Sequence, residues 1–122
     1  MDKSNQILSD LVVFNKYAKH VAGEDRRETW NEIVDRYVTM MKKRYPKLKD
    51  KIDKNSKFLY DKKVLMSMRA AQFSGAAIEK SESRVYNCAY LPIDDYRAFS
   101  ESMFLLLGGT GVGYSVQRDH VN

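Results

Sequence analysis

Two short apolar segments, separated by a helical stripe and a run of glycines, constrain the fold more than any other feature of this sequence. Residues 85–91 are rich in β-branched and aromatic side chains and stop at Pro92, a pattern typical of a buried strand. Residues 112–116 predict a second strand. Asp94 and Asp95 open a predicted helix between them, and its apolar stripe consists of Tyr96, Phe99, Met103, Phe104 and Leu107. A helical crossover of this length favours a parallel pair of strands.

Two parallel strands cannot bury both of their faces by themselves. The sequence also ends just beyond the second predicted strand, at Asn122. We therefore expect an incomplete α/β fold that belongs to a larger sheet. The pattern of side chains divides the chain into a helical N-terminal region, residues 1–63, and a strand–helix–glycine turn–strand region, residues 64–122.

The N-terminal region contains one clear helix. Apolar side chains recur there at three- and four-residue steps, namely Trp30, Ile33, Val34, Tyr37, Val38, Met41 and Tyr45. Pro46 disfavours helical geometry at the residue before it and predicts the end of this helix. A second helix is predicted over residues 47–60. Residues 7–21 fit a helix or a strand, and the polar residues 79–84 predict a loop.

Positive charge is concentrated between Lys42 and Lys63. This segment has ten basic and three acidic side chains, a net charge of +7 that exceeds the +5 of the whole chain. Such a segment could attract nucleic acid or nucleotide phosphates, or it could be the solvated face of a helix. The nearby Phe58 and Tyr60 do not form the ladder of aromatic side chains on which single strands stack.

Other features indicate a cytoplasmic protein without a membrane partner. No apolar run approaches the ~20 residues that span a bilayer. No basic stretch followed by an apolar one is visible at the start, and the single cysteine, Cys88, fits a reducing compartment. His20 has no Cys, His or carboxylate at ligand spacing, so we expect it at the surface and predict no metal site.

The glycine run 108–113 matches neither of two familiar phosphate-binding motifs. Tyr114 and Ser115 stand where a P-loop requires Lys and then Ser or Thr. A dinucleotide-binding motif needs the strand before its glycines, whereas here the helix comes first. The glycines therefore predict a tight turn between helix and strand. Cys88 fits a buried structural role or a redox role, but redox chemistry needs a second thiol from another segment.

Residues 85–95, followed after about ten helical residues by 108–116, resemble the opening of the ten-stranded α/β barrel of ribonucleotide reductase catalytic subunits. The sequence Asn87-Cys88 and the turn Gly-Thr-Gly-Val-Gly-Tyr-Ser are most similar to the adenosylcobalamin-dependent group. Residues 65–69 resemble the segment just before that barrel. Residues 15–18 and 28–34 are similar to the group's helical N-terminal region.

This resemblance implies the N-terminal part of a ribonucleoside di- or triphosphate reductase, which makes deoxyribonucleotides by thiyl-radical chemistry. It makes Cys88 one of two redox-active cysteines, places Ser67 and Asn87 at the substrate, and places Asp95 at a dNTP effector. The second redox cysteine and the radical-bearing cysteine would lie further along the barrel, so this chain alone is expected to be inactive. The implied partners are the remaining barrel segment, a thioredoxin-type or other dithiol reductant, and either adenosylcobalamin or an external metal-radical subunit.

Two other interpretations stay open. The segment of net charge +7 fits a non-catalytic module that binds nucleic acid or nucleotides, which predicts strongly salt-dependent binding to single strands. A stand-alone domain that binds nucleotides through its glycine turn would instead fold cooperatively without any partner.

Overall fold

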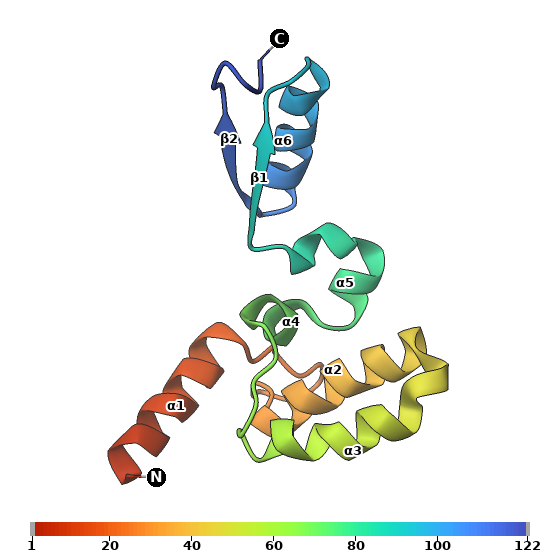
Figure 1. Cartoon of the computed structure of the whole chain (residues 1–122). Coiled ribbons are helices and arrows are strands. Elements are labelled where there is room, and N and C mark those ends of the chain that lie inside the picture. The colour runs from red at the N-terminus through yellow and green to blue at the C-terminus, as the bar shows by residue number, and fades with distance from the viewer. Residues whose placement is uncertain (1, 122) are drawn as a thin grey trace. The chain divides into compact units, whose positions relative to one another are not determined.

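A computed structural model describes residues 2–121, which divide after Ala76 into two compact units (Figure 1). The N-terminal unit consists of helices and contains α1 (Lys3–Lys16), α2 (Trp30–Arg44), η1 (Pro46–Leu48), α3 (Lys49–Tyr60) and α4 (Met68–Phe73). After it come α5 (Ala76–Lys80), η2 (Glu82–Val85), β1 (Cys88–Pro92), α6 (Arg97–Leu107) and β2 (Gly111–Ser115). The chain mixes helices with a parallel two-stranded sheet, which is compatible with the predicted α/β class. The division of the chain into regions 1–63 and 64–122 is based on the sequence pattern alone and stays a prediction.

Helix α2 begins and ends for identifiable reasons. The Thr29 hydroxyl accepts a hydrogen bond from the Glu32 backbone N–H, and the Glu32 carboxylate accepts one from the Thr29 N–H at 2.7 Å. This reciprocal cap satisfies donors that the first turn leaves free. The helix ends at Arg44, so the predicted stop before Pro46 is confirmed. Ile33 and Val34 are fully buried, as the periodicity of the sequence indicates.

The structure resolves the ambiguity of residues 7–21 in favour of a helix, α1, which continues only to Lys16. None of its residues is buried, although Val13 packs against the core that Ala18, Ile33 and Ala71 form. Helix α1 therefore adds little core of its own, which explains why its sequence shows no clean period.

Helix α4 lies in a segment for which the sequence predicts no clear element, because its apolar residues are poorly periodic. Its carboxyl end is fixed by Arg36 of α2. The guanidinium of Arg36 donates to the carbonyls of Ala71 (3.0 Å) and Ser74 (2.9 Å) and pairs with Glu28 at 2.9 Å. Long-range polar contacts therefore hold this short helix in place.

In the C-terminal unit, β1 and β2 pair in parallel with Cys88 opposite Gly111 and Pro92 opposite Ser115, and α6 connects them. The predicted strand–helix–strand order and the parallel pairing are confirmed, with the second strand one residue earlier than expected. The ribbon in Figure 1 shows α6 running alongside the two strands.

Three boundaries predicted in this unit are wrong. The first strand begins at Cys88 and not at residue 85, because Glu82–Val85 form a turn of 3-10 helix. The expected loop over residues 79–84 is partly helical, since α5 extends to Lys80. The helix predicted from Asp94 begins at Arg97.

The expectation of a buried strand is also wrong for the described residues. Cys88 and Tyr90 are exposed, and Ala89, Leu91 and Pro92 are only partly buried. The sheet has two strands in residues 2–121, so the described residues supply no further strand to flank β1 and β2. Within the same part of the chain, no helix combines the length and apolar character that crossing a membrane requires.

Candidate redox site

Cys88 is the first residue of β1, and its side chain is exposed. The side-chain amide nitrogen of Asn87 lies 3.6 Å from its sulfur, within the range of a weak hydrogen bond to a thiol. An exposed thiol on a strand does not serve the core, so the purely structural role that a single buried cysteine would have does not apply to this unit.

The face of the sheet beside Cys88 is nearly free of side chains on β2. Partners in a parallel pair share a face, and the register sets Cys88 opposite Gly111 and Tyr90 opposite Gly113. A Cβ added at Gly113 would lie 3.6 Å from the Tyr90 ring, an ordinary contact, so crowding inside this unit does not demand glycine there. The glycines instead leave open backbone next to the thiol, where another molecule can approach closely.

The turn before β2 is tied to the residues that precede Cys88. Gly109 has φ +87°, a conformation that side chains disfavour, and it directs the chain from α6 back toward the sheet. The hydroxyl of buried Thr110 donates to the Tyr86 carbonyl at 3.2 Å, and the Gly111 N–H donates to the Asn87 carbonyl at 2.9 Å. These bonds fix the backbone immediately before the thiol.

Asp95 lies at the opposite end of β1 from Cys88. The four residue steps of the strand alone amount to ~13 Å. Its carboxylate accepts a hydrogen bond from the Arg97 N–H at 2.5 Å, which holds the turn that leads into α6. The structure therefore does not bring Asp95 to Cys88, and this hydrogen bond accounts for an acidic residue at this position.

Ser67 belongs to the N-terminal unit, whereas the other three predicted site residues lie in the C-terminal unit. It is the N-cap of α4, where its hydroxyl accepts from the Ala70 N–H at 3.1 Å. Within the C-terminal unit, the predicted residues Asn87 and Cys88 are in contact.

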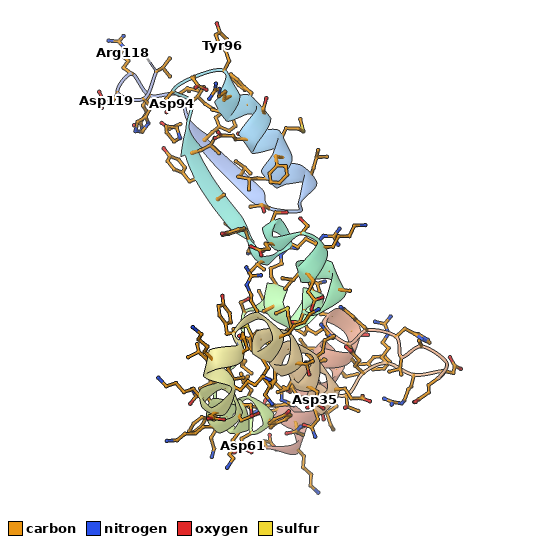
Figure 2. The ribbon with its side chains drawn as sticks, turned by 90° about the vertical axis from the view of Figure 1, so that its right-hand side faces the viewer. Asp35, Asp61, Asp94, Tyr96, Arg118 and Asp119 are labelled. Carbon is orange, nitrogen blue, oxygen red and sulfur yellow. The ribbon has the colours of Figure 1, made fainter. Side chains whose placement is uncertain are left out.

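The structure also shows a polar edge that the sequence does not predict. At the carboxyl end of β2, the buried Ser115 hydroxyl lies 2.9 Å from Nδ1 of His120 and accepts from the Gln117 N–H at 3.3 Å. Figure 2 labels four further residues that gather at this end of the unit, Asp94, Tyr96, Arg118 and Asp119. The only signal for this edge was the rule that ligands of parallel sheets bind beyond the carboxyl ends of strands.

Several charged groups with shifted pKa values lie in the N-terminal unit. Burial, together with the nearby Arg36 charge, lowers the pKa of Lys19. Burial would raise the pKa of Glu28, but hydrogen bonds from Arg36 and from the Lys19 N–H outweigh it and lower that pKa. These groups join α2 to α4. No three His, Cys, Asp or Glu side chains gather as a metal site within residues 2–121.

No family model, no curated protein and no solved structure matches the chain.

Proposed function

We propose that this chain is the N-terminal part of a ribonucleotide reductase catalytic subunit and that Cys88 is one of its two redox-active thiols. The ten-stranded barrel, its radical chemistry and the reduction of ribonucleoside di- or triphosphates belong to this proposal. It rests on the resemblance of residues 85–95 and 108–116 to the opening of that barrel.

One observation carries the proposal furthest: the exposed thiol of Cys88 stands beside the side-chain-free backbone of Gly111 and Gly113. A ribose could approach the sulfur over Gly111, whereas the Tyr90 ring lies beside Gly113. The strand and the anchored turn hold the sulfur more precisely than a loop would. The adjacent Asn87 amide is placed to contact a sugar hydroxyl.

The proposed chemistry balances with one partner thiol. Two thiols give two electrons and two protons to the substrate and become a disulfide. The 2′ carbon of the ribose loses its hydroxyl as water and gains hydrogen. Since the sequence contains a single cysteine, the second thiol comes from the remaining barrel segment. A thioredoxin-type or other dithiol reductant then restores both thiols.

Adenosylcobalamin or an external metal-radical subunit would supply the radical in this proposal. The described residues do not offer a cluster of metal-ligating side chains, so no step of that chemistry is assigned to them. Substrate contact by Ser67 and effector binding by Asp95 also belong to the proposal. The cap that Ser67 forms at α4 and the hydrogen bond of Asp95 before α6 are compatible with such contacts but do not require them.

The test is complementation with the missing barrel. The chain is co-expressed with the rest of the barrel from an adenosylcobalamin-dependent reductase, and deoxyribonucleotide formation is measured with a dithiol reductant. We expect activity from the parent chain and at least ~10³-fold less from Cys88→Ser, because a serine cannot form the disulfide.

The matched control is Ala89→Ser, which adds the same hydroxyl one residue along, on the opposite face of β1. It should retain most of the activity. Full turnover by Cys88→Ser would overturn the assignment of the thiol. Failure of the parent chain to complement, although it associates with the barrel, would count against the proposed function as a whole.

A further inference from the structure

Helices α2 and α3 of the N-terminal unit form a groove of about 530 Å³ that the proposed chemistry does not use. We call it the α2–α3 groove and define it by Tyr37 and Met41 of α2, Ile52, Phe58 and Leu59 of α3, and Val64. Phe58 and Val64 remain 49% and 56% exposed, so the apolar lining is open to solvent. Apolar side chains in such a groove gain free energy when a partner covers them.

One buried polar group of the groove already has a partner. The hydroxyl of buried Ser56 donates to the Asp53 carbonyl at 2.8 Å. Burial also raises the pKa of Tyr37, so this side chain stays neutral at physiological pH. Most of the lining side chains are apolar, so an apolar surface fits this groove.

The edge of the groove on α3 is positively charged. Lys51 lines the groove, and Lys54 and Phe58 follow at steps of three and four residues, which places the three side chains on one side of the helix. Both lysines are exposed, and within the described residues neither has a carboxylate partner. Asp53, on another side of α3, pairs with Lys42. The groove therefore combines an apolar floor with unneutralised positive charge.

We infer that the α2–α3 groove docks an amphipathic helix of another polypeptide, with an apolar stripe toward the groove and acidic side chains toward Lys51 and Lys54. Helix-in-groove recognition uses apolar anchors at i, i+3, i+4 and i+7, and the flanking charges set orientation and association rate. This inference does not depend on the proposed reductase function, because it concerns side chains of the N-terminal unit alone.

A nucleic acid fits the groove less well than an acidic helix. Phosphates would satisfy the lysines, but the sugar-phosphate backbone would leave Met41, Ile52 and Val64 uncovered. Of the two aromatic side chains in the lining, Phe58 is exposed and Tyr37 is only partly so, whereas single strands stack on a series of exposed rings.

The experiment measures binding of synthetic peptides to the full chain by fluorescence anisotropy. The probe is a helical peptide of about 18 residues with leucine on one face and glutamate beside it. A second peptide has lysine in place of every glutamate, and a labelled single-stranded oligonucleotide is the third probe. We expect saturable binding of the glutamate peptide, weakened about tenfold by Lys51→Glu and by Phe58→Ala.

The matched control is Lys49→Glu. It makes the same charge change two residues earlier, roughly 200° away around α3, and should leave binding unchanged. Circular dichroism of each variant confirms that it folds. Equal binding of the lysine peptide, equal weakening by Lys49→Glu, or no saturable binding of the glutamate peptide would overturn the inference. Oligonucleotide binding that is tighter and depends on Lys51 would replace it with a nucleic-acid site.

Discussion

The two units of this protein are stabilised in different ways. In the N-terminal unit, side chains from distant parts of the sequence meet: the Trp30 indole N–H donates to the Leu59 carbonyl at 2.9 Å, and Arg36 joins Glu28 to the end of α4. In the C-terminal unit, the strands are joined mainly by backbone hydrogen bonds and by the turn at Gly109. Its helix α6 buries Ala98 but leaves Phe99, Phe104 and Leu107 exposed.

This difference separates a region with a fully buried apolar centre from one whose strand edges stay open. The N-terminal unit fills its centre with Ile33 and Val34, which are both 0% exposed. The C-terminal unit instead has open strand edges, which favour pairing with further strands. The candidate redox thiol lies in the second kind of region, as expected if other segments complete its site.

Substitution of Arg36 should give the largest effect, and it should destabilise the N-terminal unit. Arg36→Met removes the partner of Glu28 and the donors to Ala71 and Ser74 while it keeps an aliphatic side chain of similar length. The Arg36 and Glu28 side chains are 15% and 13% exposed, so water can replace few of the hydrogen bonds that the substitution removes. We expect a loss of about 3 kcal/mol in the free energy of unfolding, measured by urea titration of Trp30 fluorescence.

Arg26→Met is the matched control, because Arg26 pairs with Glu32 at 2.9 Å but is 43% exposed. Exposed pairs contribute about 1 kcal/mol or less, so this variant should lose much less stability. Equal losses of stability in the two variants would show that the mostly buried contacts of Arg36 contribute no more than the exposed pair of Arg26.

Gly109→Ala should give the next largest effect, this time in the C-terminal unit. The residue has φ +87°, and a side chain in a left-handed conformation costs about 1–2 kcal/mol. Hydrogen exchange of the Gly111 and Ile93 amides, which donate to Asn87 and Ser115, should become faster by roughly tenfold.

Gly113→Ala is the control for that turn, because the added methyl would meet the Tyr90 ring at an ordinary 3.6 Å. It should change stability by no more than about 0.5 kcal/mol. Unchanged exchange in Gly109→Ala would mean that the turn does not limit the stability of the strand pair.

The sequence predicts elements well where local chemistry decides them. The apolar stripe of α2 and Pro46 locate that helix, and the strand–helix–glycine order predicts the parallel pair. Elements held by distant side chains were missed, such as α4, whose end depends on Arg36. The burial of β1 could not be predicted either, because a strand pattern does not reveal whether neighbouring strands are present.

The candidate site also combines contacts that the local sequence decides with contacts that only the fold creates. Adjacent residues such as Asn87 and Cys88 are necessarily neighbours, so the sequence could place them together. The contact of Ser115 with His120 and the glycine face opposite Cys88 depend on register and on the path of the chain after β2. No spacing in the sequence encodes these contacts, and only the fold shows them.

Acid should produce the smallest effect, confined to the N-terminal unit. A hydrogen bond from Arg26, followed by those from Thr29, lowers the pKa of Glu32 from 4.5 to about 2. The folded state therefore binds this proton more weakly than the unfolded state. Its stabilising contribution is present above pH 4.5 and disappears as the pH falls toward 2.

Urea titrations of Trp30 fluorescence over this range should show that the free energy of unfolding depends less on pH in Glu32→Gln than in the parent chain. Thr29→Ala should lower stability by about 1 kcal/mol at each pH yet keep most of the slope, because Arg26 remains. A parent-like slope in Glu32→Gln would assign the acid sensitivity to other carboxylates of this unit, such as Glu28.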